Sequence, residues 1–138
     1  MNEKRLSVFI SHSVKDIPLT SALYRELKQE VWLTPWLDTE DLRPGQDFAF
    51  EILKALYSAN VALVCISNNA LPMTGYFKSE VIKILELAKK RSDAEFQILI
   101  LRLDDAQIPE EVAMYPSVNA AGGVTEVLEV LRKRMENR

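Results

Sequence analysis

The sequence predicts an α/β protein of flavodoxin-like architecture, with a central parallel five-stranded sheet between two layers of helices. Short apolar, β-favouring runs alternate with segments whose apolar residues recur every three or four positions. The apolar runs are too continuous for strands with one face in water, and they are typical of parallel sheets covered on both faces. A length of 138 residues suits one domain, which we assign to residues 1–138.

The first strand and the first helix lie in the N-terminal quarter of the chain. Residues 6–10 form a β-favouring run that ends at a polar group, Ser11, His12 and Ser13, so we expect a buried strand followed by a loop. Residues 16–30 predict a helix, because leucines recur there at every fourth position: Leu19, Leu23 and Leu27.

Two more strands, a loop and a helix are expected in the middle of the chain. Residues 33–38 and 61–66 predict the second and third strands. Between them, residues 39–46 lack periodicity and contain a Pro-Gly turn signature, so we expect a protruding loop. The helix after the loop is expected to be capped by Asp47 and to bury Phe48, Ile52 and Leu56.

The C-terminal half continues the alternation. A helix capped by Thr74 is expected to run to about Lys90, with an apolar stripe of Phe77, Val81, Ile84, Leu85 and Ala88. Residues 96–103 predict a fourth strand that helices cover on both faces. A connector begins at 109–111, and residues 117–120 predict a short last strand. A closing helix is expected to bury Val124, Val127, Leu128 and Leu131.

Polar residues gather where the predicted strands end. In open parallel sheets, ligands bind beyond the carboxyl ends of the strands. These ends fall at residues 11–13, from Asp38 onward, from Ser67 onward and at Asp104. We therefore expect the functional site at this edge of the sheet.

Composition argues against several classes of protein and site. A net charge of −3 does not favour nucleic acid as a partner. The single cysteine, Cys65, lies in an apolar run and is expected to be buried, and a lone histidine, His12, is too little for a zinc site. We expect no metal and no cofactor. The apolar runs are too short for a secretory segment or a membrane span, so we expect a cytoplasmic protein without a membrane partner.

Common nucleotide and phosphate motifs are missing. The first strand is not followed by G-x-G-x-x-G, and no G-x-x-x-x-G-K-[ST] is present, which argues against a Rossmann dinucleotide site and a P-loop. The third strand ends at Ile66 and Ser67, where a phosphoacceptor receiver domain would need an aspartate.

Four segments resemble the Toll/interleukin-1 receptor (TIR) domain family in order and spacing. They are VFISH at 8–12, WLD at 36–38, LRPG at 42–45 and GYFKSE at 75–80. Some TIR domains are scaffolds that assemble through TIR–TIR contacts in innate immune signalling. Others, including many bacterial ones, cleave NAD+, and bacterial defence is one role that the resemblance suggests.

The resemblance implies an NAD+ nucleosidase (NADase) that uses NAD+ as a substrate. We expect nicotinamide and ADP-ribose as products, or a cyclic ADP-ribose isomer if the enzyme is a cyclase, and activation by self-association with other TIR domains as a homo-oligomer or filament. The main alternative is a non-catalytic TIR–TIR interaction module. A nucleoside deoxyribosyltransferase-like enzyme, which also combines such a sheet with a catalytic glutamate, is a more distant one.

Glu80 matches the glutamate that is essential in enzymatic TIR domains. Nicotinamide leaves NAD+ as a neutral molecule, so the reaction needs no general acid. A fixed carboxylate can stabilise the positive charge that develops on the ribose. The alternative for Glu80 is a solvated helix residue that pairs weakly with Lys83.

Tyr76 and Asp38 are the next candidates for substrate binding. Tyr76 precedes Glu80 by one helical turn and is expected on the same face, where its ring could hold the cationic nicotinamide. Enzymatic relatives often have tryptophan at this position. The alternative is a tyrosine packed under the preceding loop. Asp38 matches an acidic residue near the bound nucleotide, although a strand-end aspartate is also a common turn former.

The remaining candidates line the other wall of the cleft or the protruding loop. Ser11, His12 and Ser13 match a loop in which some relatives have arginines, and Arg43 could supply the phosphate contact instead. Phe9 could serve as a base platform, although core packing is the plainer expectation for a strand residue. Self-association is expected through the loop residues Leu42, Arg43, Pro44 and Gly45.

Overall fold

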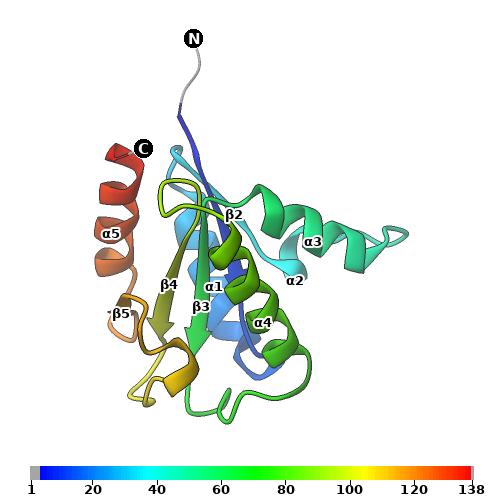
Figure 1. Cartoon of the computed structure of the whole chain (residues 1–138), viewed down its shortest axis with the longest axis vertical. Coiled ribbons are helices and arrows are strands. Elements are labelled where there is room, and N and C mark those ends of the chain that lie inside the picture. The colour runs from blue at the N-terminus through cyan, green and yellow to red at the C-terminus, as the bar shows by residue number, and fades with distance from the viewer. Residues whose placement is uncertain (1–3, 138) are drawn as a thin grey trace.

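Five parallel strands form one sheet in the computed structural model, which describes residues 4–137 (Figure 1). Their order across the sheet is β2-β1-β3-β4-β5. The strands are β1 (Leu6–Ser11), β2 (Leu33–Trp36), β3 (Val61–Ile66), β4 (Gln97–Arg102) and β5 (Ser117–Asn119). The predicted flavodoxin-like α/β architecture is confirmed.

Helices cover both faces of this sheet (Figure 1). One face packs against α1 (Ile17–Lys28) and α5 (Thr125–Glu136), and the other against α3 (Phe48–Ser58) and α4 (Gly75–Lys90). Three short helical turns lie in the connections: η1 (Val14–Asp16), α2 (Asp38–Asp41) and η2 (Glu110–Val112). None of the helices among residues 4–137 is both long and apolar enough to span a bilayer.

Alternation along β1 decides which side chains reach the functional edge. Val8 and Ile10 pack with α1 and α5, whereas Phe9 packs with α3 and α4. Successive side chains of a strand point to opposite faces, so Ser11 lies on the same face as Phe9. The last residue of β1 therefore faces α4.

The strand order places a topological switch point beside β1. The chain runs from β1 outward to β2 and then returns to β3 on the other side of β1. The helix after β1 covers one face and the helix after β3 covers the other. The connections after β1 and β3 therefore diverge, which opens a crevice of the kind that binds ligands in such sheets.

The predicted second strand is too long by two residues. It ends at Trp36, and Asp38 begins the single turn α2, in which the amide of Leu42 donates to the carbonyl of Asp38 at 3.1 Å. The predicted loop over 39–46 is accordingly wrong for residues 39–41, which are helical. Leu37 remains buried although it lies outside the strand, and its apolar side chain accounts for the overextended prediction.

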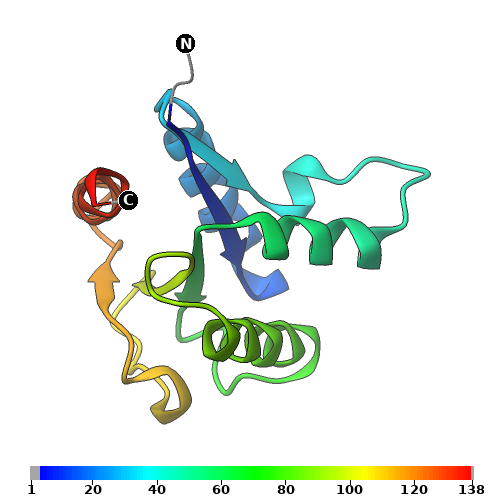
Figure 2. The same ribbon diagram turned by 45° about the horizontal axis from the view of Figure 1, so that its top comes forward.

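The predicted inner stripes of α1 and α3 are each wrong at one position. Leu19 is exposed, and α1 is shorter than 16–30 because Asp16 belongs to η1 and the helix ends at Lys28. Phe48 is 50% exposed, since α3 leaves the sheet and projects outward with the preceding loop at its far end (Figure 2). Leu56, in the last turn of α3, is its one fully buried residue among those described.

The helix caps and strand ends were predicted with mixed success. The Asp47 carboxylate accepts from the amide of Phe50 at 3.2 Å, which confirms the cap of α3. The side chain of Thr74 makes no capping hydrogen bond, so that prediction is wrong. β1 extends one residue further than 6–10. The strands predicted at 96–103 and 117–120 are shorter than expected, and η2 lies in the connector.

The two edges of the sheet are short. β2 has four residues and includes Pro35, which lies opposite Val8, and β5 has three residues. The three central strands, β1, β3 and β4, have six residues each and carry most of the core. Cys65 lies in β3 and is buried, as predicted.

Candidate active site

Polar side chains from three elements meet at the carboxyl edge of the sheet. Ser11 ends β1, Asp38 begins α2 after β2, and Glu80 lies on α4. His12 and Ser13 follow Ser11 directly and are buried as well. The predicted site residues from these elements therefore lie together at the switch point.

Glu80 is a buried carboxylate with a donor on each oxygen. It is 7% exposed, and its Oε1 accepts a hydrogen bond from Ser11 Oγ at 2.5 Å. Its Oε2 accepts from Tyr76 Oη at 3.2 Å. Since Glu80 is buried against Ser11, the alternative of a solvated residue that pairs with Lys83 is wrong.

Tyr76 lies at the mouth of the site. It is 52% exposed, and helical spacing brings its hydroxyl to Glu80 one turn further along α4. Partial burial and the negative charge of Glu80 raise the pKa of the Tyr76 phenol, so it stays neutral and keeps donating. Because its side chain is largely exposed, the alternative in which Tyr76 packs under the preceding loop is wrong.

The electrostatics of Glu80 are a balance between burial and hydrogen bonding. Burial raises the pKa of Glu80, the bonds from Ser11 and Tyr76 lower it, and the nearby charge of Asp38 raises it again. The net result is a pKa above the ordinary value of 4.5. Any positive charge that forms beside a buried carboxylate of this kind stabilises its ionised form.

His12 and Asp38 form a second polar pair beside Glu80. His12 Nε2 lies 2.8 Å from Asp38 Oδ1, and His12 Nδ1 lies 2.9 Å from the Ser13 carbonyl oxygen. Burial alone would raise the pKa of Asp38, but the bond from His12 and the amide of Thr39 hold it below 3.8. Asp38 is therefore ionised at neutral pH.

Asp16 and Ser67 belong to the same edge, and sequence reasoning missed their pairing. Ser67 Oγ donates to Asp16 Oδ2 at 2.6 Å, and both residues are buried. Within residues 4–137, Asp16 Oδ1 has no hydrogen-bond partner. This bond links the connection after β1 to the end of β3. The position of Ser67 at a predicted strand end is a signal for this pairing, whereas the sequence places Asp16 at the start of a helix and gives no sign of its partner.

Phe9 and Arg43 do not reach the polar cluster. The Phe9 ring is buried and stacks on Trp36 with their centroids 5.5 Å apart, so it packs in the core. Arg43 is exposed in the loop, where its guanidinium donates to the carbonyl of Glu40 at 2.8 Å. No hydrogen bond or ion pair joins Arg43 to Glu80 or Asp38 in the part of the chain that the structure describes.

A hollow of about 430 Å³ adjoins the polar cluster on the side of the loop. It is lined by Asp38, Thr39, Leu42, Pro44 and Phe48. Asp38 therefore borders both the polar cluster and this mostly apolar hollow. The combination of charged and apolar walls is typical of sites that hold a small molecule.

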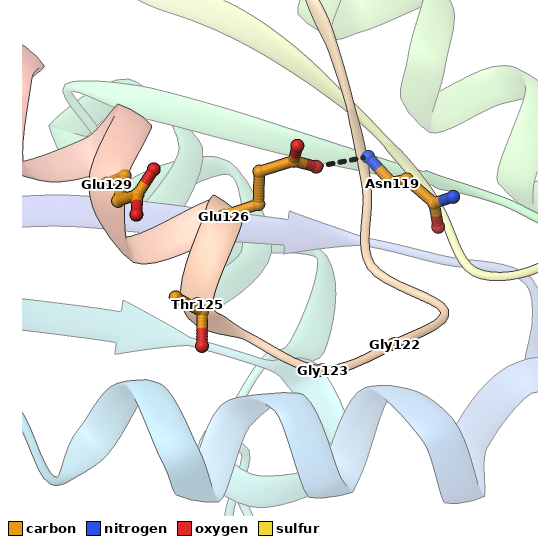
Figure 3. A pocket seen from close by; sticks show the side chains of 6 residues that line it. All are labelled: Asn119, Gly122, Gly123, Thr125, Glu126 and Glu129. Atoms are coloured by element: carbon orange, nitrogen blue, oxygen red, sulfur yellow. Dashed lines mark hydrogen bonds between the residues drawn. The ribbon is translucent and has the colours of Figure 1, made fainter.

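Another hollow, of about 460 Å³, lies where α5 begins (Figure 3). Two carboxylates, from Glu126 and Glu129, line it, and Glu126 accepts from the backbone amide of Asn119 at 3.2 Å. Negative charge is thus already present at this helix start, which does not favour an anionic ligand. Among residues 4–137, no group of three or more His, Cys, Asp or Glu side chains could hold a metal ion.

Comparison with protein families matches residues 8–129 to the TIR domain. The chain belongs to the TIR domain family. The matched region includes every element of the polar cluster, from Ser11 on β1 to Glu80 on α4. A comparison with curated proteins finds no match.

The TIR domain family includes both NAD-cleaving and signalling members. TIR domains generally interact with other TIR domains. Family membership therefore accounts for the fold of this TIR domain, while the choice between the two activities depends on its own site.

Proposed function

We propose that this TIR domain is an NADase that cleaves the bond between nicotinamide and ribose in NAD+. The observation that carries the proposal is the buried Glu80 carboxylate, held by Ser11 and Tyr76 at the switch point of the sheet. A fixed negative charge in a partly desolvated crevice is suited to a reaction whose transition state is cationic.

Glu80 would act on the ribose as the glycosidic bond breaks. The bonding electron pair goes to the pyridine nitrogen, so nicotinamide leaves as a neutral molecule and positive charge develops on the ribose. Attack by water then gives ADP-ribose and a proton. Attack by an adenine nitrogen gives a cyclic ADP-ribose isomer. In both cases the carboxylate stabilises the same cationic transition state.

Tyr76 and Asp38 would place the substrate around this carboxylate. The exposed Tyr76 ring can contact the cationic nicotinamide, an interaction worth about 0.5–2 kcal/mol. Asp38 borders the hollow with Leu42, Pro44 and Phe48, whose apolar walls suit a nucleotide base. The substrate would thus bridge the polar cluster and the hollow.

A non-catalytic TIR–TIR interaction module is the second candidate function. Its supporting observation is the exposure of Phe48 and Phe50 on the projecting helix α3, next to the loop of Leu42, Arg43, Pro44 and Gly45. Exposed apolar groups beside a protruding loop are typical of protein interaction sites. The two functions are compatible, because self-association could also activate the enzyme.

The test is nicotinamide release from NAD+ by concentrated protein clustered on a solid support. We expect release by the wild type and a loss of about 100-fold or more in Glu80→Ala, because the electrostatic stabilisation is removed. The measurement is chromatography of nicotinamide and of the ADP-ribose product.

Glu86→Ala is the matched control, since Glu86 is an exposed acid on the same helix. It should release nicotinamide like the wild type. Equal release by wild type and Glu80→Ala would refute the role of Glu80. Equal silence of all three clustered proteins would favour the interaction module.

A further inference from the structure

Both ring nitrogens of the buried His12 face oxygen atoms that accept hydrogen bonds. The Ser13 carbonyl, 2.9 Å from Nδ1, has no proton to donate, so Nδ1 must carry a hydrogen. The Asp38 carboxylate, 2.8 Å from Nε2, is ionised and also only accepts, so Nε2 must carry one too. A ring with hydrogens on both nitrogens is the imidazolium cation.

The charges around His12 support this cation. The charged groups that face it are Asp38 from α2 and Glu80 from α4, and both are acids. Tyr76, also on α4, lies beside these two acids as a neutral phenol. Burial by itself lowers the pKa of His12, but the bonds to Asp38 and Ser13 and the two negative charges outweigh it, so the pKa lies above 6.5.

The same pair connects the sheet to the loop. His12 directly follows β1, and Asp38 is the first residue of α2, which leads into the loop. Asp38 Oδ1 also accepts from the amide of Thr39 at 2.8 Å. These two donors reach the same oxygen, Oδ1, and the Asp38 residue also borders the hollow beside the loop.

We propose that His12 is a positioning residue that acts as an imidazolium: it fixes Asp38 and the first turn of α2 against the end of β1. In this role His12 does not exchange a proton with substrate, because both of its N–H groups are held by the protein. It sets the position of the Asp38 carboxylate beside the hollow and the direction in which the loop leaves the sheet. The contribution of this geometry to NAD+ binding rests on the proposed function, whereas the charge state of His12 does not.

The single histidine of the chain makes the charge state directly measurable. In tag-free protein, the imidazole signals in a long-range ¹⁵N NMR spectrum belong to His12 without further assignment. We expect both ring nitrogens to be protonated in most molecules at pH 6.5, with a titration midpoint above 6.5. A ring that is mostly neutral at pH 6.5, with one protonated nitrogen, would overturn the proposal.

Asp38→Asn tests the pairing. Loss of the carboxylate charge should lower the His12 midpoint by about one pH unit or more. Glu40→Gln neutralises another acid of α2 and should leave the midpoint unchanged. An unchanged midpoint in Asp38→Asn, or an equal fall in the control, would contradict the assignment.

A separate NMR measurement tests whether His12 positions α2. In the wild type, the backbone amide signals of α2 should shift with the same midpoint as the His12 ring, because loss of the positive charge of the ring weakens its hydrogen bond to Asp38. If the α2 amide signals do not change with the His12 midpoint, His12 does not fix the position of α2. Since NAD+ is not used in any of these measurements, their failure is separate from a failure of the proposed function.

Discussion

At the scale of single residues, the burial of the Glu80 carboxylate lowers the stability of the fold. Its two hydrogen bonds do not cancel the cost of burial, so the folded protein favours the protonated form. A carboxyl whose pKa is raised on folding binds its proton more tightly in the folded chain. Stability therefore falls as the pH rises from 4.5 through the folded pKa, and the full cost is present above it.

Replacing Glu80 with glutamine should relieve this cost. We expect Glu80→Gln to raise the free energy of unfolding at pH 7 by about 0.5–2 kcal/mol, with a smaller effect at pH 4, where the carboxyl is largely protonated in both states. Urea denaturation at the two pH values is the measurement. Glu86→Gln, an exposed substitution on α4, should change neither value. A loss of stability in Glu80→Gln at pH 7 would contradict the balance described for Glu80.

At the scale of elements, α3 has fewer buried residues than the other long helices, α1, α4 and α5. Leu56 is fully buried, while Phe48 and Phe50 point to solvent, so packing contributes little at the N-terminal end. The Asp47 cap satisfies one of the amides that the first turn leaves without partners. A helix that begins away from the core should depend on its cap more than a packed helix does.

Asp47→Ala should lower the free energy of unfolding by about 1 kcal/mol, because alanine cannot accept from the amide of Phe50. Asp47→Asn retains an oxygen acceptor and should keep most of that stability. Urea unfolding followed by circular dichroism measures both. If alanine and asparagine cost the same, the cap does not stabilise α3.

Elements could be predicted from the sequence where their patterns are local. The stripe of Phe77, Val81 and Ile84 and the continuous run of β3 are readable without tertiary information, and both are buried. Phe48 was misassigned because helical spacing shows which residues share a face but not whether that face meets the sheet. Asp38 was misassigned because an apolar Leu37 outside a strand looks like one more strand residue.

The polar cluster was only partly predictable for the same reason. Tyr76 and Glu80 lie one turn apart on α4, so their shared face follows from spacing alone. The pairs His12–Asp38, Ser11–Glu80 and Asp16–Ser67 join residues 26, 69 and 51 positions apart. Such pairs depend on strand order, which places β1 between β2 and β3 and which propensities do not specify.

At the scale of the whole molecule, the projecting loop and α3 form the part that extends furthest from the sheet (Figure 2). Pro44 and Gly45 lie in the turn of this loop, and Gly45 has a φ of 92°, a conformation that favours glycine. The loop therefore has a defined shape that a second copy of the domain could recognise.

Pro44→Ala should weaken self-association. We expect light scattering of the wild type to show an apparent mass that rises with concentration, and the variant to stay monomeric over the same range. Lys89→Ala, at the far end of α4, is the control and should associate like the wild type. Association of Pro44→Ala equal to that of the wild type, or a wild type that stays monomeric throughout, would refute assembly through the loop.

The short edges of the sheet limit aggregation when many copies of the domain lie close together. A sheet edge offers unpaired amides and carbonyls to any neighbouring strand, and long, flat edges invite fibrous aggregation. Here Pro35 removes one amide donor from β2, and β5 is too short to template a long pairing. Densely gathered copies of this chain therefore have little opportunity to join strand to strand. Contacts between them are left to loops and helices, where association stays reversible and the sheet stays intact.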